Sequence, residues 1–467
     1  MRPLKPLMLV RPPLGILSDP GFWEELEDAC IDEVIIQWLA LLDEPGAGGA
    51  GATTYPQAED THPRALAAVG GSPVERTPVA SYVPNLPLYE GLRYQPPPMP
   101  RRLADDAARL REAVEAASRR GLRVYVMDDK GYFLRGGFGV GGQAPPVACM
   151  SDPELAGYAV TRTRDTLANY PSLAGIVLDG PDFKWEIAPG HRDDMFVEEC
   201  GCRHCERVAG SLGITYARVI EGRDRFGDRL RSLSPAAVKD AVRNRVGLFG
   251  AFDWWAENPA VLDWMRFKYA AVEQHVKAIY DGIKEYLPEL DVGVSARMPA
   301  LAPLTGHSLR RTRGYSDFQL PKLYWWPGGV AGFRGTVMNW AATLREWNPG
   351  LSEEDATAWL RAALGVPMPG DYPVSTYGSE APDEWFATTV EDQVRKMAAA
   401  AGSADALVPW VGLEHFGSTW ITPSELRRLL SVMRSHGLNR YAYFVYNSIR
   451  PPIWDVIREF ARDAAGS

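Results

Sequence analysis

The sequence predicts an α/β fold, a (β/α)8 TIM barrel with long loop insertions at its C-terminal face. Eight short runs rich in β-branched and aromatic residues alternate with longer helical patterns along the chain. The length of 467 residues holds eight such units with room for insertions. A doubly wound sheet would also alternate, but no Gly-x-Gly-x-x-Gly turn follows the first run, which disfavours that fold.

The eight strands are expected where the β-branched and aromatic runs lie, at Leu7–Arg11, Asp32–Trp38, Arg123–Asp128, Gly175–Asp179, Asp291–Arg297, Phe318–Trp325, Ala406–Glu414 and Arg440–Asn447. Most of the helical patterns begin with Pro, Asp or Thr, which suit the start of a helix. The main helices are expected at Pro20–Ala29, Arg101–Arg120, Asp152–Tyr170, Pro259–Tyr286, Pro382–Ala401, Thr422–Ser435 and Pro451–Ala465.

We expect a single catalytic domain over residues 1–467, interrupted by two insertions. The first, residues 42–100 after the second strand, is rich in Gly and Pro. Such a long loop in a compact domain usually serves as a lid or a binding loop. The second, residues 181–258 after the fourth strand, begins with a cysteine-rich loop and continues as a helical stretch with Trp254 and Trp255 near its end.

Composition and charge exclude several classes of protein. The net charge of −9 comes with no long basic run, which argues against nucleic-acid binding. No stretch approaches the roughly 20 apolar residues that span a bilayer, and the apolar run near the N-terminus is too short for a signal peptide. Five cysteines, four of them grouped, suit a reducing compartment. We therefore expect a cytoplasmic protein without membrane or nucleic-acid partners; a homo-oligomer is compatible with the sequence.

The most informative motif is Cys200-Gly-Cys202-Arg-His204-Cys205, because three thiolates so close together can bind one soft cation. Cys149 lies in the loop after the third strand, on the same face of the barrel as the motif. Four thiolates complete the tetrahedral site that structural zinc prefers. We predict a structural Zn2+ site made by these four cysteines, with no position left open for a catalytic water.

Other assignments of these residues stay open. The thiols could be unmetallated, and His191 and His204 are rival ligands, although we expect His204 to point to solvent. Cys30 precedes the second strand and is therefore at the opposite end of the barrel. We expect it to be a small buried apolar residue.

Carboxylates collect at the C-terminal ends of the strands, where barrel enzymes hold their reacting groups. The opposite strand ends look unremarkable. Asp179 ends the fourth strand and Glu414 ends the seventh, on facing sides of the pocket. Glycoside hydrolysis needs such a pair: one carboxyl protonates the leaving oxygen, and the other attacks or stabilises the anomeric carbon. We assign Glu414 as the nucleophile or charge stabiliser; the reverse assignment, with Asp179 as nucleophile and Glu414 as acid, stays open.

Further residues near these strand ends could serve catalysis or substrate binding. Asp182 and Glu186 follow Asp179 on the loop and could reach the same space, or simply bind sugar hydroxyls. Flat aromatic rings can stack on the apolar faces of sugars, and cations could bind an acidic substituent or neutralise the carboxylates. The expected catalytic residues are Glu414, Asp179 and Asp182, and the expected substrate-binding residues are Asp129, Lys130, Trp185, Glu186, Arg297, Lys322, Tyr324, Trp325, Trp410 and Asn447.

The chain resembles the glycoside hydrolase barrels of family 42 β-galactosidases and the hypothetical glycosyl hydrolase families related to them. The resemblance rests on the run Gly175-Ile-Val-Leu-Asp-Gly-Pro-Asp-Phe183, on the Cys200-x-Cys202-x-x-Cys205 loop with Cys149 upstream, and on Gly412-Leu-Glu414. It implies that the four cysteines hold zinc beside the active site and that Glu414 is the nucleophile.

One position departs from that family. Leu178-Asp179-Gly180 stands where family 42 has Asn-Glu, whose glutamate is the acid/base. The Asp-Gly ending also resembles α-fucosidases of family 29, in which the aspartate of the fourth strand is the nucleophile. The sequence thus predicts a glycosidase, retaining in mechanism, that cleaves an oligosaccharide or glycoside with carboxylates from strands four and seven.

Two alternatives belong to other classes of function. The first is a non-catalytic carbohydrate-binding barrel that has lost the glutamate of the fourth strand. The second is a zinc-dependent hydrolase, against which the histidine-poor pocket argues.

Overall fold

The structure of the protein is a computed structural model. It describes residues 4–465 with the exception of residues 11–12, 38, 44–76, 97, 130–148, 191, 198–200, 245–246, 330, 370–372, 416–418 and 447–448.

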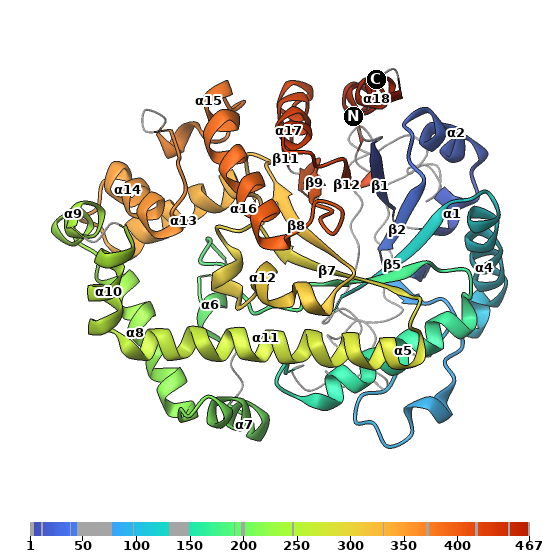
Figure 1. The fold of residues 1–467 in the computed structure, drawn as a ribbon, viewed down its shortest axis with the longest axis horizontal. Coiled ribbons are helices and arrows are strands. Elements are labelled where there is room, and N and C mark those ends of the chain that lie inside the picture. Colours follow the sequence, from blue (N-terminus) through green and yellow to red (C-terminus); the bar gives the residue numbers. More distant parts are fainter. Residues whose placement is uncertain are drawn as a thin grey trace.

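Eight parallel strands form a closed barrel surrounded by helices, which confirms the predicted (β/α)8 fold (Figure 1). Around the barrel the strands follow the order β1, β2, β5, β6, β7, β8, β9, β12 and back to β1. Their bounds are Lys5–Val10, Glu33–Gln37, Arg123–Asp129, Gly175–Asp179, Asp291–Arg297, Phe318–Tyr324, Trp410–Gly412 and Arg440–Phe444. Each of these eight strands lies at a predicted position.

Side chains alternate along each strand between the barrel interior and the layer of helices, because successive residues of a strand point to opposite faces. Strand β8 shows the rule. Phe318 and Leu320 pack inside the barrel with Val177 and Leu9, whereas Leu323 belongs to the cluster between strands and helices. This parity also decides which polar residues reach the mouth of the barrel.

The described helices between the strands include the seven that the sequence predicts and several that it does not. The first set comprises α2 (Pro20–Asp28), α4 (Ala104–Arg119), α5 (Pro153–Asn169), α11 (Pro259–Tyr286), α15 to α16 (Asp383–Ala401), α17 (Pro423–Ser435) and α18 (Pro451–Ala465). The helices α13 (Phe333–Trp347) and α14 (Glu353–Leu364) lie between β8 and β9 and were not predicted.

Additional elements lie where the two insertions were expected. In the first, β3 (Ala40–Asp43) pairs antiparallel with β4 (Thr77–Ala80). After β6, the chain forms α6 (Asp194–Val197), α7 (Arg203–Ser211), α8 (Tyr216–Arg231), α9 (Pro235–Asn244) and α10 (Gly247–Glu257) before it reaches α11. Helix α11 runs across the lower part of Figure 1 from α8 to α5. Among the described helices, none is long and apolar enough to cross a membrane.

Charged side chains close the amino ends of the strands, which contradicts the expectation that these ends are unremarkable. Arg440 Nη2 lies 2.6 Å from Glu33 Oε2, and Arg123 Nη2 lies 2.5 Å from Asp291 Oδ2. The hydroxyl of Tyr125 donates to Asp291 Oδ2 at 3.1 Å. These four charged residues stand at or near the start of four strands and point inward, so the closure of the barrel brings them together.

Candidate functional site

Asp179 is the last residue of β6 and lies at the mouth of the barrel. Its parity is that of Val177, which packs in the barrel interior, so its side chain points inward. The side chain is 17% exposed. Gly180 follows with φ of +62°, a conformation that glycine adopts without steric cost, and turns the chain away from the strand.

Lys322 pairs with Asp179 across the barrel mouth. Its Nζ lies 2.7 Å from Asp179 Oδ1, and its side chain is 10% exposed. Burial alone would raise the pKa of the Asp179 carboxyl, but the charge and hydrogen bond of Lys322 outweigh it. The charge of Arg297 and a hydrogen bond from Ser295 act in the same direction, so the pKa of Asp179 is held below its ordinary value. Asp179 is therefore an ionised carboxylate.

Ser295 connects Asp179 to the barrel interior. The indole Nε1 of Trp410 donates to Ser295 Oγ at 3.1 Å, and the hydroxyl of Ser295 in turn is free to donate to Asp179. A residue that both accepts and donates in this way orients the carboxylate. Sequence reasoning missed Ser295. The available signal was its position two residues before Arg297 on the same strand, which places both side chains on the inward face.

Asp182 and Arg297 form a second, looser pair beside the first. Arg297 Nε lies 3.8 Å from Asp182 Oδ2, and the guanidinium lies 5.3 Å from the ring centroid of Trp185. The buried His307 is close enough to feel the charge of Asp182. Burial lowers the pKa of His307 to about 4, although the charge of Asp182 opposes the shift, so the imidazole next to Asp182 is neutral near pH 7.

Glu414 lies just beyond β9, in a short ribbon in which β10 (Glu414–His415) pairs with β11 (Thr419–Trp420). The Leu413 N–H donates to the carbonyl of Phe444 at 2.8 Å, which fixes the ribbon to the end of β12. Glu414 is 1% exposed. Alternation from Trp410, which packs in the barrel interior, puts Glu414 on the inward side.

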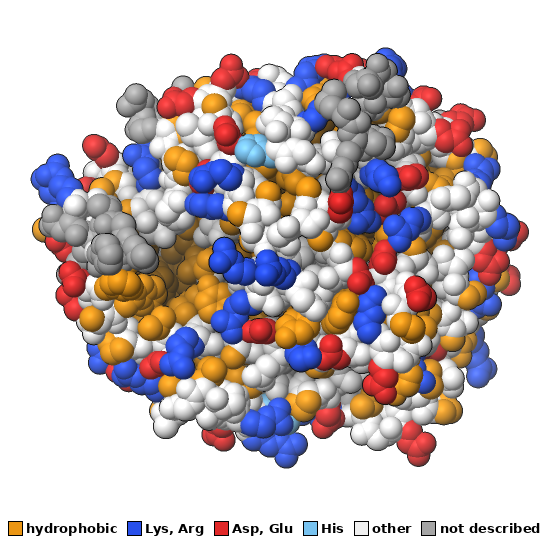
Figure 2. Space-filling view, viewed as in Figure 1, with side chains coloured by type: hydrophobic (Ala, Val, Ile, Leu, Met, Phe, Trp, Pro, Cys, Tyr) orange, Lys and Arg blue, Asp and Glu red, His pale blue; other side chains and the backbone are white. Residues whose placement is uncertain are grey.

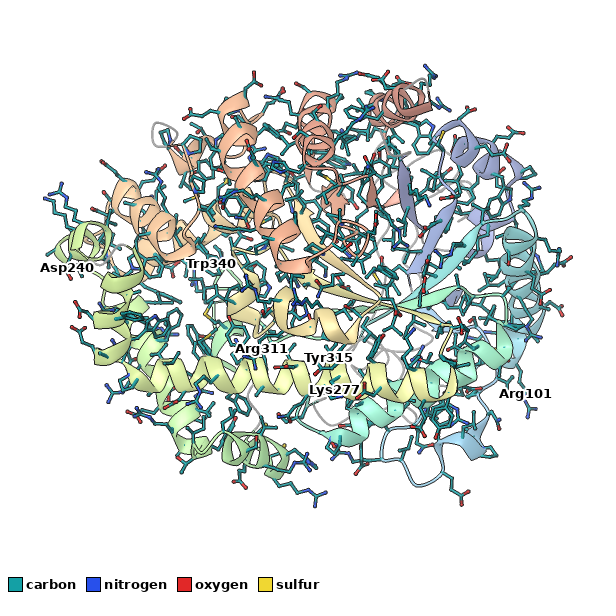
Figure 3. All side chains as sticks on the ribbon, in the orientation of Figure 1. Arg101, Asp240, Lys277, Arg311, Tyr315 and Trp340 are labelled. Carbon is teal, nitrogen blue, oxygen red and sulfur yellow. The ribbon has the colours of Figure 1, made fainter. Side chains whose placement is uncertain are left out.

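Glu186 is occupied by contacts within the protein. Its carboxylate accepts from Trp340 Nε1 at 3.0 Å, from the Ala331 N–H at 3.4 Å and from Thr336 Oγ1 at 3.5 Å. Trp340 (labelled in Figure 3) also packs against Trp185, with ring centroids 5.9 Å apart. Trp185 and Glu186 thus tie the loop after β6 to α13. Sequence reasoning missed Trp340, because α13 itself was not predicted.

All four aromatic residues expected at the mouth, Trp185 included, are buried side chains of the core. Tyr324 stacks on Trp326 with centroids 4.3 Å apart, and Trp410 is enclosed in the same interior cluster. Trp325 points outward and stacks on Phe333 at 5.6 Å. Their contact with a substrate stays a prediction. Their burial argues against it.

The remaining substrate-binding predictions fall at the edge of the described structure. The backbone of Asp129 ends β5 in register with Asp179. Lys130 and Asn447 lie outside the described residues.

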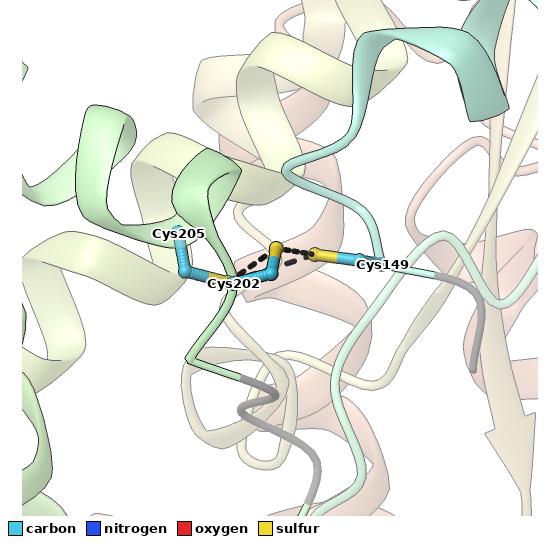
Figure 4. A group of neighbouring side chains, drawn as sticks. All are labelled: Cys149, Cys202 and Cys205. Atoms are coloured by element: carbon cyan, nitrogen blue, oxygen red, sulfur yellow. Dashed lines mark hydrogen bonds between the residues drawn. The ribbon is translucent and has the colours of Figure 1, made fainter. Parts of the chain in front are cut away.

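The thiols of Cys149, Cys202 and Cys205 come together between the loops after β5 and β6 (Figure 4). The sulfur–sulfur distances are 3.5 Å between Cys149 and Cys205, 3.7 Å between Cys149 and Cys202, and 3.9 Å between Cys202 and Cys205. Thiolates on a tetrahedral zinc, with Zn–S bonds of about 2.3 Å, lie about 3.8 Å apart. The three sulfurs therefore fit such an ion. Cys200 lies outside the described residues.

Asp152 fixes the geometry of the loop that carries Cys149. Its N–H donates to the carbonyl of Cys149 at 2.9 Å, and its carboxylate caps α5 by accepting from the Glu154 N–H at 3.0 Å. His204 Nε2 lies 3.6 Å from the Asp152 carboxylate and its side chain is 12% exposed, so the expectation that His204 points to solvent is wrong. His191 lies outside the described residues.

The prediction that Cys30 is buried is wrong. Cys30 is exposed and has φ of +51° in the turn that ends α2, where its N–H donates to the carbonyl of Glu27. This turn directs the side chain to solvent. Its exclusion from the cysteine cluster agrees with the group of three thiols found in the described part of the chain.

No protein-family model and no curated protein matches the chain. It is similar to the structure of the PgaB (BpsB) glycoside hydrolase domain from Bordetella bronchiseptica, with 12% identity, a TM-score of 0.47, and coverage of 99% of this chain and 98% of that one. It is also similar to the β-galactosidase of Halorubrum lacusprofundi, with 12% identity, a TM-score of 0.47, and coverage of 99% and 58%. At these values the likeness carries no argument about activity. The fold and the site define a (β/α)8 barrel with ion-paired carboxylates at its carboxyl face.

Proposed function

We propose that the protein is a glycoside hydrolase that cleaves an oligosaccharide or glycoside at the carboxyl face of the barrel. The observation that carries the proposal is the ion pair of Asp179 and Lys322 at the mouth, which keeps one carboxylate ionised. Glycoside hydrolysis requires one ionised carboxylate and one carboxylic acid on opposite sides of the scissile bond. Glu414, in the ribbon that follows β9, is the candidate for the second.

The low pKa of Asp179 favours the assignment in which Asp179 is the nucleophile and Glu414 the acid. A general acid must hold a proton near neutral pH, and Lys322 and Arg297 oppose protonation of Asp179. Asp179 would attack the anomeric carbon while Glu414 protonates the departing oxygen. Water, deprotonated by Glu414, would then release the sugar with retention of configuration.

The other polar residues of the mouth would support this reaction. Lys322 would hold Asp179 in its ionised form. Asp182, kept near Arg297 and Trp185, would be available for a sugar hydroxyl or as an alternative acid. Glu186 would act indirectly, by holding the loop after β6 against α13.

We further propose that Cys149, Cys200, Cys202 and Cys205 bind a structural Zn2+ beside this site. The spacing of the three described thiols supports the proposal. When bound, the ion would join the loops after β5 and β6. The chain's own carboxylates, rather than the metal, would carry out the reaction.

The test is turnover of aryl glycosides by the variants Asp179→Asn and Glu414→Gln. We expect Asp179→Asn to lose about 1,000-fold or more in kcat/KM on every substrate, because the nucleophile is removed. Glu414→Gln should lose about 100-fold or more with a poor leaving group and far less with 2,4-dinitrophenolate, which leaves without protonation.

The matched control is Asp291→Asn, which removes an ion-paired aspartate at the opposite end of the barrel. It should keep kcat/KM within about twofold once its thermal stability has been verified. If the wild type cleaves a substrate and both mouth variants keep its full rate, the proposed roles are wrong.

A further inference from the structure

Helix α10 carries a group of aromatic side chains that are in part open to solvent. Phe252 is 55% exposed, and Trp254 and Trp255 are partly exposed. The two indoles meet edge to face, with centroids 4.5 Å apart and an interplanar angle of 83°. Figure 2 shows hydrophobic side chains around a hollow at the left of the view, where Figure 1 has α8, α10 and α13. Partly exposed aromatic side chains that gather on one helix are candidates for a binding surface.

Arginines of α8 lie over the ring of Trp254 and over the rings of Phe196 and Trp347. The guanidinium of Arg229 lies 5.7 Å from the ring centroid of Trp254. That of Arg231 lies 4.9 Å from the ring of Phe196 and 4.8 Å from that of Trp347. The aromatic faces and the N–H donors of arginine therefore occupy one region, formed by α6, α8, α10 and α13.

Buried residues connect this region to the candidate catalytic site through the packing of the molecule. Phe196 is in α6, and the neighbouring Met195 donates its N–H to the carbonyl of Glu186 at 3.3 Å. Glu186 follows Trp185, which lies under Arg297 at the mouth. Trp185, Glu186, Met195 and Phe196 belong to the segment that follows β6, the strand that ends in Asp179, whereas Arg297 ends β7.

We propose that Phe252, Trp254 and Trp255, with Arg229 at their edge, form an aromatic surface that binds sugar units of an oligosaccharide beyond the cleaved bond. The inference rests on the proposed function and narrows its substrate class. A glycan of several units would occupy both the mouth and the aromatic surface, whereas a short glycoside would occupy the mouth alone.

The chemistry of the aromatic surface favours a saccharide over a second copy of the chain. Pyranose rings have apolar C–H faces and hydroxyl rims, which suit indole faces beside arginine donors. A stable dimer needs about 800 Å2 of largely apolar surface on each partner. Asp253 and Glu257, both exposed, interrupt α10 with charges that such an interface would have to desolvate.

The test compares binding of short and long saccharides to the full chain by titration calorimetry. The probes are the disaccharides and hexasaccharides of β-1,4-linked glucose, N-acetylglucosamine and mannose, with the Asp179→Asn variant used to prevent turnover. We expect one hexasaccharide to bind at least tenfold more tightly than its disaccharide. In the Asp179→Asn background, Trp254→Ala with Trp255→Ala should remove about tenfold of hexasaccharide affinity and leave the disaccharide unchanged.

Tyr286→Ala is the matched control, because Tyr286 is an exposed aromatic residue at the far end of α11; it should change neither affinity. If the double alanine variant melts early, Trp254→Phe and Trp255→Phe keep the rings and must keep the length dependence. Equal affinity for both lengths in all three series would overturn the proposal, as would a dimer in sedimentation that the double variant dissociates. Turnover is a separate readout. Length-dependent binding without any turnover in the wild type would reject the proposed function but would still support saccharide binding by the aromatic surface.

Discussion

The two ends of the barrel carry charge clusters of the same composition, and comparing them shows what distinguishes a candidate active site from a structural closure. Each cluster has two acids and two bases: Glu33, Asp291, Arg123 and Arg440 at the amino ends of the strands, and Asp179, Asp182, Arg297 and Lys322 at the carboxyl ends. In both clusters every charge has an opposite charge within 3.8 Å. Ion pairing alone therefore does not mark the site.

The clusters differ in the burial of one pair and in what lies around them. At the amino ends, the Glu33–Arg440 pair is as buried as the Asp179–Lys322 pair, but the side chain of Arg123 is 49% exposed, so its charge remains in contact with water. At the carboxyl ends, Lys322 and Asp179 are both largely buried, and Ser295 hydrogen-bonds to Asp179. The Asp179–Lys322 pair keeps one carboxylate ionised. The ion pairs at the amino ends hold the strand ends together.

Loss of the metal should produce the largest change in stability, and only at the carboxyl end. The proposed site links Cys149 to Cys205, 56 residues apart, so a bound ion acts as a cross-link in the unfolded chain. For a loop of this length the expected contribution is about 4 kcal/mol in the free energy of unfolding. Urea denaturation of the protein before and after chelation, with zinc measured by elemental analysis, checks this value.

Cys30→Ser is the control for thiol chemistry in general, because Cys30 is exposed and outside the cluster. It should behave as the wild type, whereas Cys202→Ser should resemble the chelated protein. A protein purified with added zinc that contains none, and a Cys202→Ser variant of unchanged stability, would both contradict the zinc site.

Breaking one ion pair at each end should separate the clusters next. Lys322→Met leaves Asp179 buried without its main partner, and we expect a loss of about 3 kcal/mol in the free energy of unfolding, since Arg297 still compensates part of the charge. Arg123→Met removes a half-exposed partner and should cost about 1 kcal/mol or less. Urea unfolding at pH 7 measures both.

The same two variants should differ in the pH dependence of activity. Asp179 has a pKa below its ordinary value, so activity that needs the ionised form is kept to low pH and is lost as the pH falls through that pKa. Lys322→Met should move this acidic limb of kcat/KM upward, and Arg123→Met should leave it in place. An unmoved limb in Lys322→Met would show that Lys322 does not control Asp179.

The sequence predicted the strands better than the helices between β8 and β9, for physical reasons. Each strand is a β-branched or aromatic run, and that local pattern survives folding. Helix α13 contains Gly335, Val337 and Asn339, which favour helix poorly, and it forms because it packs on the barrel. Helix α14 had a readable signal, the capping box of Ser352 and Asp355, which the analysis of helical patterns missed.

For the candidate site, the strand-end rule located the acids but not their partners. Asp179 of β6 pairs with Lys322 of β8. Which side chains meet depends on how far the strands are shifted along one another in the closed barrel, and the sequence of neither strand reveals this shift. Trp325 points to the outside of the barrel and the preceding residue, Tyr324, to the inside, so an error of one residue in the strand register exchanges the two. The burial of Glu186 depends on Trp340, 154 residues further along the chain.

The last expected effect is a pH-dependent loss of stability that arises from His307 at the carboxyl end. Burial lowers the pKa of His307 from 6.5 to about 4, so between these values the unfolded chain binds a proton that the folded chain does not. Stability should therefore fall as the pH drops from 6.5 towards 4, by about 2 kcal/mol between pH 7 and pH 5 for this group. His307→Gln should remove this part of the pH dependence while Arg123→Met retains it, as urea unfolding at pH 7 and pH 5 would measure. An identical difference between the two pH values in the wild type and His307→Gln would mean that His307 is not the group responsible.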